Sequence, residues 1–268
     1  MEKSKKLFHI TQKEMKKIKV LEMIDQPFLG GGQVNILSLV DSLDSSKFEV
    51  AVCSRDNGPF VDEVKRRNVE HFPVPFSKKI NRKIFKNIIS ILQNNRIDIL
   101  HTHGGVAGFF GRWTARKCNI PVIIHTLHGI HYLHYRNIFL KYFYVLLERM
   151  FSRFTHALIL VSDADRERGK KLKLAPEEKL MVIKNGIDFS LFESRFENVD
   201  RQNYTKSEFG LDSSQPCVGT VARLHRQKGI TFLLRAARRI NKAFPRSRVL
   251  IVGGGPLQKK LERMNRSL

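Results

Sequence analysis

The sequence predicts an α/β protein with a Rossmann-like, doubly wound parallel sheet. Short apolar runs alternate with helical patterns along most of the chain. Alternation of this kind is typical of parallel sheets covered by helices on both faces. The apolar runs are also continuous in Val, Ile and Leu rather than alternating with polar residues, as expected for strands buried on both sides.

The first part of the chain is expected to form one complete domain over residues 18–187, preceded by a basic tail over 1–17. Strands are expected where β-branched and apolar residues cluster between turn residues. These runs are Ile18–Ile24, Phe48–Ser54, Val69–Val74, Ile97–His101, Val122–Thr126, Ala157–Val161 and Leu180–Ile183. Helices are expected where apolar residues recur every three or four positions. They are Gln33–Leu43, Phe60–Arg67, Ile80–Asn94, Val106–Lys117, Ile138–Arg153 and Asp163–Lys173.

The alternation stops at Gly186 and restarts after a polar, irregular stretch, so residues 188–215 indicate a crossing between domains. The elements expected after it are Cys217–Ala222, Gly229–Ala243, Arg248–Val252 and Pro256–Met264. Two strands and two helices cannot bury both faces of a parallel sheet. Residues 216–268 are therefore expected to be the opening of a second, incomplete Rossmann-like domain in a C-terminally truncated chain.

The net charge of the chain narrows the classes of molecule that it could bind. The chain carries 48 Lys and Arg against 25 Asp and Glu, a net charge of +23, which points to phosphates, anionic lipid or nucleic acid. No RNA- or DNA-binding module is recognisable, so nucleic acid is the unlikely partner among these.

Three widely separated cysteines without a CxxC pair exclude a disulfide framework and favour a reducing compartment. Without an apolar run of about 18 residues, a cytoplasmic location is expected.

Three successive glycines, Gly30, Gly31 and Gly32, separate the first strand from the first helix. Glycines let backbone N–H groups approach an anion closely, and the helix N-terminus adds about half a positive charge. Because residue 35 is Asn35, the spacing is not G-x-G-x-x-G, and a dinucleotide dehydrogenase is disfavoured. A tight turn without a ligand is the alternative.

Histidines follow two neighbouring predicted strands: His101 and His103 after one, and His128 after the next. Open α/β sheets place their sites at the carboxyl ends of strands, where an imidazole can donate a hydrogen bond or transfer a proton. Alternatively, these rings are satisfied by loop carbonyls or exposed. Three further histidines flank His128: His125, His131 and His134. No carboxylate or cysteine joins them at ligand spacing, so no metal site is expected.

The stretch from Gly219 to Gly229 places Arg223 at a strand end and Lys228 just before a helix. A guanidinium and an ammonium beside a helix N-terminus suit a diphosphate, although exposed cations are common in a basic chain. Gly253-Gly254-Gly255-Pro256 repeats the strand–glycine–helix design, with the proline expected at the first helical position. Asn185-Gly186 closes the strand before the crossing and is compatible with a simple turn.

Taken together, these stretches resemble the GT-B glycosyltransferases, in particular the retaining family 4 enzymes, also called group 1 glycosyltransferases. The matching stretches occur in the family's order. They are Gly30–Gly32, Asp98–His103, Thr126–Gly129, Val182–Asp188, Gly219–Gly229 and Val252–Pro256. The resemblance covers nearly all of the chain from Ile18 onward.

The resemblance implies an acceptor-side N-domain facing a C-domain that holds a nucleotide-diphospho-sugar. Arg223 and Lys228 would then neutralise the diphosphate leaving group, and His128 would reach the donor sugar near the reacting carbon. The remaining assigned residues have binding roles. They are Gly253 and Gly254 for the donor, Gly30, Gly31, Gly32 and His103 for the acceptor or a phosphate, and Asn185 and Gly186 in the interdomain cleft. The family typically needs no metal or cofactor, because the cationic pair supplies the positive charge.

Two features depart from the family pattern. Gln33 stands where many relatives continue the glycine loop toward an acidic residue. The family's later acidic motif, two glutamates separated by seven residues, is absent and would lie beyond Leu268. The expected function is therefore sugar transfer to a cell-envelope or lipid-linked acceptor, with a non-catalytic binding remnant as the alternative.

The resemblance also makes peripheral contact with the anionic inner face of the plasma membrane thinkable. Basic residues at the start of the third helix would supply it: Lys78, Lys79, Arg82, Lys83 and Lys86. A solvated basic face on a sheet-covering helix is the favoured alternative. Burial is expected for a nearby aromatic group: Tyr132, Tyr135, Phe139, Tyr142, Phe143 and Tyr144.

Overall fold

The computed structural model describes residues 16–77, 79–187, 189, 206–212 and 214–266. The chain divides into two compact units, Met1–Asp188 and Phe189–Leu268. The expected tail over 1–17 and crossing over 188–215 lie largely outside the described residues. Within the crossing, one short 3-10 helix is described, η3 (Lys206–Phe209).

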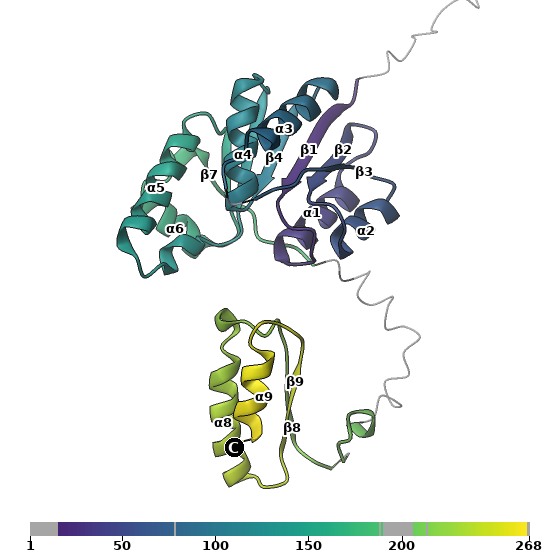
Figure 1. The fold of residues 1–268 in the computed structure, drawn as a ribbon, viewed down its shortest axis with the longest axis vertical. Coiled ribbons are helices and arrows are strands. Elements are labelled where there is room, and N and C mark those ends of the chain that lie inside the picture. The colour runs from purple at the N-terminus through teal and green to yellow at the C-terminus, as the bar shows by residue number, and fades with distance from the viewer. Residues whose placement is uncertain (1–15, 78, 188, 190–205, 213, 267–268) are drawn as a thin grey trace, which may run out of the picture. The chain divides into compact units, whose positions relative to one another are not determined.

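The first unit is a seven-stranded parallel sheet in the order β3-β2-β1-β4-β5-β6-β7, with helices packed along it (Figure 1). Its strands are β1 (Ile18–Ile24), β2 (Phe48–Ser54), β3 (Glu70–Pro73), β4 (Ile99–His103), β5 (Val122–Leu127), β6 (Ala157–Leu160) and β7 (Leu180–Val182). Its helices are α1 (Gly31–Ser42), α2 (Pro59–Arg66), α3 (Arg82–Asn94), α4 (Gly105–Lys117), α5 (Ile138–Ser152) and α6 (Asp163–Lys171), with 3-10 turns η1 (His131–His134) and η2 (Glu177–Lys179). The predicted doubly wound parallel sheet is confirmed.

Alternate residues of β1 supply the cores on the two faces of the sheet, as the two-residue repeat of a strand requires. Leu21 and Met23 pack with residues of α3 and α4, whereas Ile24 packs with residues of α1 and α2. In β1, odd-numbered residues such as Leu21 therefore face α3 and α4, and even-numbered residues such as Ile24 face α1 and α2.

The order of the strands creates a switch point between β1 and β4. From β1 the chain proceeds through α1 to β2 on one side, and from β4 it proceeds through α4 to β5 on the other. Open α/β sheets bind ligands outside the carboxyl ends of the strands at such a point. The two ends lie side by side, because Ile24 pairs with His103.

Most element boundaries differ by one or two residues from the sequence-based prediction, and two of these differences lie at the switch point. Helix α1 begins at Gly31 rather than Gln33, so two of the three glycines form its first turn. Strand β4 runs from Ile99 to His103, so Thr102 and His103 also lie in the strand rather than after it. Hydrogen bonding within the sheet and helix extended both elements over residues whose local propensity did not favour them.

Helix α5 presents a broad apolar face to solvent. Its most exposed large side chains are Ile138, Phe139, Tyr142, Phe143 and Leu146, of which Phe139 is 84% exposed. The expected burial of Phe139, Tyr142 and Phe143 is therefore wrong, as is that of Tyr135, which is also exposed. Inward-facing positions such as Val145 and Phe151 already fill the contact with the sheet, so the remaining apolar positions of this helix point outward.

Helix α3 has the ordinary amphipathic arrangement. Ile84, Ile88 and Leu92 are buried, while Lys79, Arg82, Lys83 and Lys86 are exposed. Lys78 lies outside the described residues. No described helix combines the length and the apolar character that crossing a bilayer requires.

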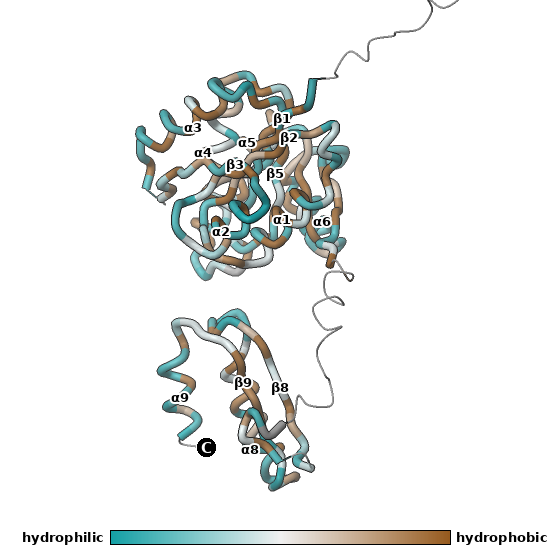
Figure 2. Tube along the Cα trace, turned by 90° about the vertical axis from the view of Figure 1, so that its right-hand side faces the viewer, coloured by the Kyte–Doolittle hydropathy of each residue, from teal (hydrophilic) through white to brown (hydrophobic). Residues whose placement is uncertain are grey.

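The second unit contains a parallel pair, β8 (Cys217–Val221) and β9 (Arg248–Val252), with α8 (Ile230–Ala243), α9 (Gln258–Arg266) and η4 (Arg226–Lys228). Leu224, Ile230, Leu234 and Leu261 form its buried cluster. Figure 2 shows β9 as largely hydrophobic and α9 as largely hydrophilic. Because α9 begins at Gln258, Pro256 precedes the helix instead of opening it as predicted.

Candidate functional site

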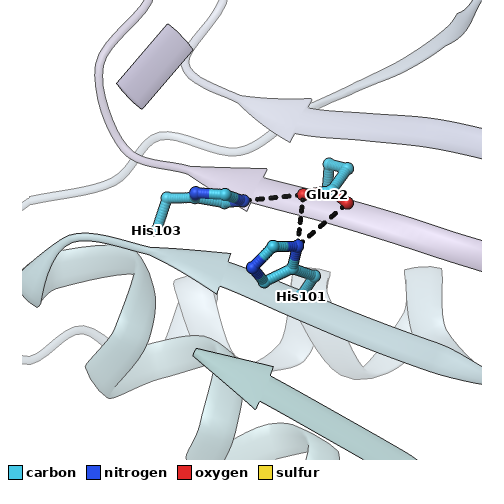
Figure 3. A group of neighbouring side chains, drawn as sticks. All are labelled: Glu22, His101 and His103. Atoms are coloured by element: carbon cyan, nitrogen blue, oxygen red, sulfur yellow. Dashed lines mark hydrogen bonds and ion pairs between the residues drawn. The ribbon is translucent and has the colours of Figure 1, made fainter. Parts of the chain in front are cut away.

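A buried carboxylate lies at the switch point of the first unit. Glu22 interrupts the apolar strand β1 and is 2% exposed. It pairs with His101 of β4, and its parity places it on the face opposite Leu21 and Met23. Figure 3 shows Glu22, His101 and His103 pointing toward one another from these two adjacent strands.

Glu22 accepts hydrogen bonds from both histidines. His101 Nδ1 lies 3.0 Å from Glu22 Oε1, and His103 Nε2 lies 2.7 Å from Oε2. Burial by itself would raise the pKa of Glu22, but its interactions with His101 and His103 outweigh burial and lower the pKa to about 2. The carboxylate is thus ionised at neutral pH and acts only as an acceptor.

His103 links this carboxylate to His128, the histidine in the loop after β5. His103 Nδ1 lies 2.9 Å from His128 Nε2, and the two rings stack at 5.2 Å between centroids. Burial lowers the pKa of each imidazole to about 4, assisted by the neighbouring His101. Both rings are therefore neutral near pH 7 and offer hydrogen bonds rather than charge.

His125 lies on the other face of the sheet and takes no part in this cluster. Its Nδ1 is 3.0 Å from the carbonyl oxygen of Thr102, and a Cβ added at Gly108 of α4 would meet its ring at 2.5 Å. Burial lowers its pKa well below the ordinary value. His125 is a packing residue beneath α4.

The glycine loop contacts His128 directly. A Cβ added at Gly32 would lie 3.2 Å from Cδ2 of His128, while one added at Gly31 would meet nothing within 4 Å. Gln33 is buried, and its Nε2 donates to the carbonyl oxygen of Gln26 at 2.9 Å. The loop is held in place, with the uncapped N-terminus of α1 beside His128.

The structure thus brings together three of the predicted regions of the first unit: the glycine loop, His103 and His128. Asn185 joins them indirectly, because Asn35 Nδ2 of α1 donates to its Oδ1 at 3.2 Å. Gly186 follows Asn185 in an exposed segment without regular secondary structure. The predicted cleft role of Asn185 and Gly186 stays a prediction.

The predicted donor residues lie at the carboxyl edge of the β8–β9 pair. Arg223 follows β8 by two residues and is exposed, and Lys228 ends η4 and is also exposed. The loop containing Gly253 and Gly254 runs alongside, since Leu224 N donates to the Gly254 carbonyl oxygen at 2.8 Å. At Gly253, φ is +139°, and a Cβ would meet the Ala222 carbonyl oxygen at 2.1 Å, so only glycine fits there.

A hollow of about 630 Å³ lies between α8, α9 and β9 of the second unit. Its lining includes Gly253, Arg238, Arg248 and Glu262, but neither Arg223 nor Lys228. It therefore does not coincide with the predicted diphosphate-binding pair.

Within the described part of the chain, Glu22, His101 and His103 are the group whose metal-binding atoms all lie within 4.8 Å of one another. These atoms already satisfy one another as hydrogen-bond partners. We therefore interpret the group as a hydrogen-bonded cluster. The expected absence of a metal stays a prediction.

Sequence reasoning missed Glu22, because its partners are 79 and 81 positions away. A signal was present. Glu22 is the acidic residue inside an otherwise apolar run from Val20 to Ile24, and a charge in a doubly covered strand needs a partner.

Comparisons with known proteins indicate the family. The family model described as Glycosyltransferase Family 4 matches residues 29–191, and the model described as Glycosyl transferases group 1 matches residues 202–268. The UDP-Gal:alpha-D-GlcNAc-diphosphoundecaprenol alpha-1,3-galactosyltransferase of Escherichia coli is 29% identical over 253 residues, covering 92% of this chain and 64% of that protein. The alpha-monoglucosyldiacylglycerol synthase of Acholeplasma laidlawii is 24% identical, with 89% and 63% covered.

Solved structures share the fold. A glycosyltransferase from Rickettsia africae superposes with a TM-score of 0.71 at 18% identity, covering 94% of this chain and 64% of that one. Anabaena HepE in complex with UDP and glucose gives a TM-score of 0.71 at 16% identity, with 93% and 65% covered. The chain spans about 64% of the length of the Escherichia coli relative and of the Rickettsia africae structure.

Two consecutive family models account for the sequence from residue 29 onward, and the fold of the solved relatives matches the one described above. The chain therefore belongs to glycosyltransferase family 4, the group 1 glycosyltransferases, and has the GT-B fold.

Proposed function

We propose that this protein transfers a sugar from a nucleotide-diphospho-sugar to a lipid-linked acceptor of the cell envelope, with retention at the reacting carbon. The first unit would provide the acceptor side and His128, and the second unit would hold the donor diphosphate. Arg223 and Lys228 would stabilise the charge that develops on the leaving group. They would do so without a metal or a cofactor.

The convergence of the glycine loop, His103 and His128 at the β1–β4 switch point carries this proposal. These residues come from three separate segments, yet Gly32 abuts His128 and His103 hydrogen-bonds it. A family resemblance alone would not require such packing. It is the arrangement expected where a ligand approaches the carboxyl edge of an open sheet.

The relatives support the substrate classes. The E. coli relative is named for UDP-Gal and a diphosphoundecaprenol-linked sugar, and the A. laidlawii relative for a diacylglycerol product. Both names contain a membrane lipid. The solved relative HepE was crystallised with UDP and glucose. The family membership supports the retaining mechanism.

The outward face of α5 supports contact with the membrane that carries such a lipid. Phe139, Phe143 and Leu146 recur at helical spacing and are 84%, 56% and 61% exposed. Helix α3, with its exposed basic start, lies on the same side of the sheet as α5. Helix α4 packs against α3 and is joined to α5 by the buried Arg112–Glu148 pair. Exposed apolar residues and cations on one side of the sheet suit an anionic bilayer surface. We propose peripheral attachment at the inner face of the plasma membrane.

Binding of UDP-galactose, measured by calorimetry, tests the donor site. Arg223→Ala and Lys228→Ala should each weaken binding about tenfold or more, because a hydrogen bond to a charged group contributes roughly 1.5–3 kcal/mol. Arg235→Ala, at an exposed arginine of α8, is the matched control and should leave the affinity unchanged. Unchanged affinity in both the Arg223 and Lys228 variants would contradict the diphosphate assignment.

A further inference from the structure

We propose that Glu22 and His103 are positioning residues that fix His128 in one tautomer, with hydrogen on Nε2 and a free lone pair on Nδ1. In that form His128 accepts a hydrogen bond from a hydroxyl group of the bound sugar. The inference rests on the proposed function for the sugar. The state of the three side chains follows from their own geometry.

The first link is the bond between Glu22 and His103. The carboxylate can only accept, so the hydrogen in the 2.7 Å contact belongs to Nε2 of His103. Both partners are buried, with His103 0% and Glu22 2% exposed, and water does not compete for either atom. Because the ring of His103 is neutral near pH 7, its Nδ1 carries a lone pair.

The second link passes this choice on to His128. Nδ1 of His103 can only accept, so the hydrogen in the 2.9 Å contact belongs to Nε2 of His128. His128 is itself neutral near pH 7. Its remaining nitrogen, Nδ1, is therefore an acceptor without hydrogen.

That acceptor has no partner among the described residues. Nδ1 of His128 is shielded from solvent and makes no hydrogen bond, although the ring as a whole is only half-buried. An unpaired buried acceptor costs roughly 1–3 kcal/mol, and such groups call for a functional explanation. A ligand that supplies a donor would remove this cost.

The chemistry of the lone pair selects the kind of ligand group. A sugar hydroxyl can donate to it, whereas the oxygens of an ionised phosphate only accept and would be repelled. The neighbouring N-terminus of α1, at Gly31 and Gly32, offers N–H donors instead. The site thus offers an acceptor at Nδ1 of His128 for a hydroxyl group, and N–H donors at the start of α1 for an anionic oxygen.

His101 provides an internal comparison. It also donates to Glu22, and its Nε2 lies 2.7 Å from Thr126 Oγ1. It is nearly as buried as His103, at 7% exposed, but it does not lie on the path from Glu22 to His128. Removing it should loosen the cluster without changing the direction of the hydrogen bonds along that path.

Long-range proton–nitrogen NMR spectra of the ¹⁵N-labelled chain, without any nucleotide, test the assignment. Free neutral imidazole exchanges between two tautomers, so a single Nε2–H form at His128 in the wild type is the expected result. Glu22→Gln should give a mixture at His128, since the amide can present either a donor or an acceptor to His103. His101→Gln, the matched control, should keep the single form.

The other outcomes overturn the proposal. They are a wild-type His128 with hydrogen on Nδ1 or in both forms, a Glu22→Gln spectrum with the single form kept, or an equal change in His101→Gln. Should Glu22→Gln not fold, a coupling in the wild type to Nδ1 of His103 from a hydrogen bonded to Nε2 of His128 decides. Its presence supports the relay and its absence overturns it. Because no sugar nucleotide is added, failure of the proposed transfer activity would not alter these readings.

Discussion

The carboxylate of Glu22 organises the side chains around it. An isolated buried carboxylate is costly, but here two imidazoles from the adjacent strand donate to it. The result is an ionised group whose pKa is lowered to about 2 although it is 2% exposed. One acidic residue in β1 therefore holds two histidine side chains of β4 in place as hydrogen-bond donors.

Stability should fall as the pH is lowered below about 6.5. The folded pKa of His103 is about 4 against an ordinary 6.5, so between these values the unfolded chain binds a proton that the folded chain does not. His71, His125 and His128 are shifted in the same direction. Glu22 adds a further loss from about 4.5 down to about 2. His103 alone accounts for roughly 3 kcal/mol, because one pKa unit corresponds to about 1.4 kcal/mol.

Urea unfolding followed by the fluorescence of Trp113 measures this dependence. Trp113 is the one tryptophan in the sequence and lies on α4, so its signal reports on the first unit. His103→Gln should give a shallower slope of unfolding free energy against pH between about 4 and 6.5. An unchanged slope would show that His103 does not contribute to the loss of stability between about pH 6.5 and 4.

Helix α4 packs unusually close to the sheet because two of its inward positions are glycines. A Cβ at Gly111 would meet Thr102 Cγ2 at 2.6 Å, and one at Gly108 would meet the His125 ring at 2.5 Å. The helix is further held by Arg112, which makes two hydrogen bonds to Glu148 of α5 and lies over the Phe151 ring. This packing fixes β4 and β5 beneath the helix, and with them His103 and the loop of His128.

Gly108→Ala should destabilise the first unit by roughly 1–3 kcal/mol, the usual cost of overpacking a core. His125 is 0% exposed and has no free space into which to move. Gly105→Ala is the matched control, because it lies at the start of the same helix and its Cβ would meet nothing within 4 Å. The Trp113 unfolding curve gives both values. Equal stability of the two variants would contradict the close packing.

Two features belong to the scale of the whole molecule: the strand order and the net charge. The order β3-β2-β1-β4-β5-β6-β7 places the ends of β1 and β4 next to each other, which assembles the candidate site from distant segments. The net charge of +23 favours approach to anionic surfaces and makes such binding sensitive to salt. The proposed membrane contact through the exposed apolar face of α5 would not be screened by salt.

Vesicle co-sedimentation should detect both contributions. The chain is expected to bind phosphatidylglycerol vesicles more tightly than phosphatidylcholine vesicles. Phe139→Ser combined with Phe143→Ser should weaken binding at least tenfold, because burial of one such side chain contributes roughly 1.5–3 kcal/mol. Lys83→Glu combined with Lys86→Glu should weaken binding to the anionic vesicles alone and reduce its dependence on salt.

Phe232→Ser is the matched control for the α5 variant, since Phe232 is 70% exposed on α8 of the second unit. It should leave vesicle binding unchanged. If it weakens binding as much as the α5 double variant does, general hydrophobicity rather than α5 accounts for the interaction.

Local patterns were sufficient to predict most elements of the fold. Strand Phe48–Ser54 has bounds that match the structure, because its apolar and β-branched residues stand between polar turn residues. Boundaries at the site were less accurate: α1 gained Gly31 and Gly32, and β4 gained Thr102 and His103. In these positions hydrogen bonds to neighbouring segments outweighed the weak preferences of the residues themselves.

The sequence by itself determined the alternation of strands and helices, the positions of the glycine loops and the residues at the carboxyl ends of the strands. Only the tertiary structure decided that Glu22 contacts His101 and His103, since this depends on which strands are neighbours and on their register. Only packing decided which side of α5 faces water, because Phe139 and Phe151 are equally apolar in the sequence, yet one is 84% and the other 1% exposed. The helical periodicity of apolar residues predicts which face of a helix is buried only when the faces differ in polarity. Where apolar residues surround the helix, the neighbours that it meets determine what is buried.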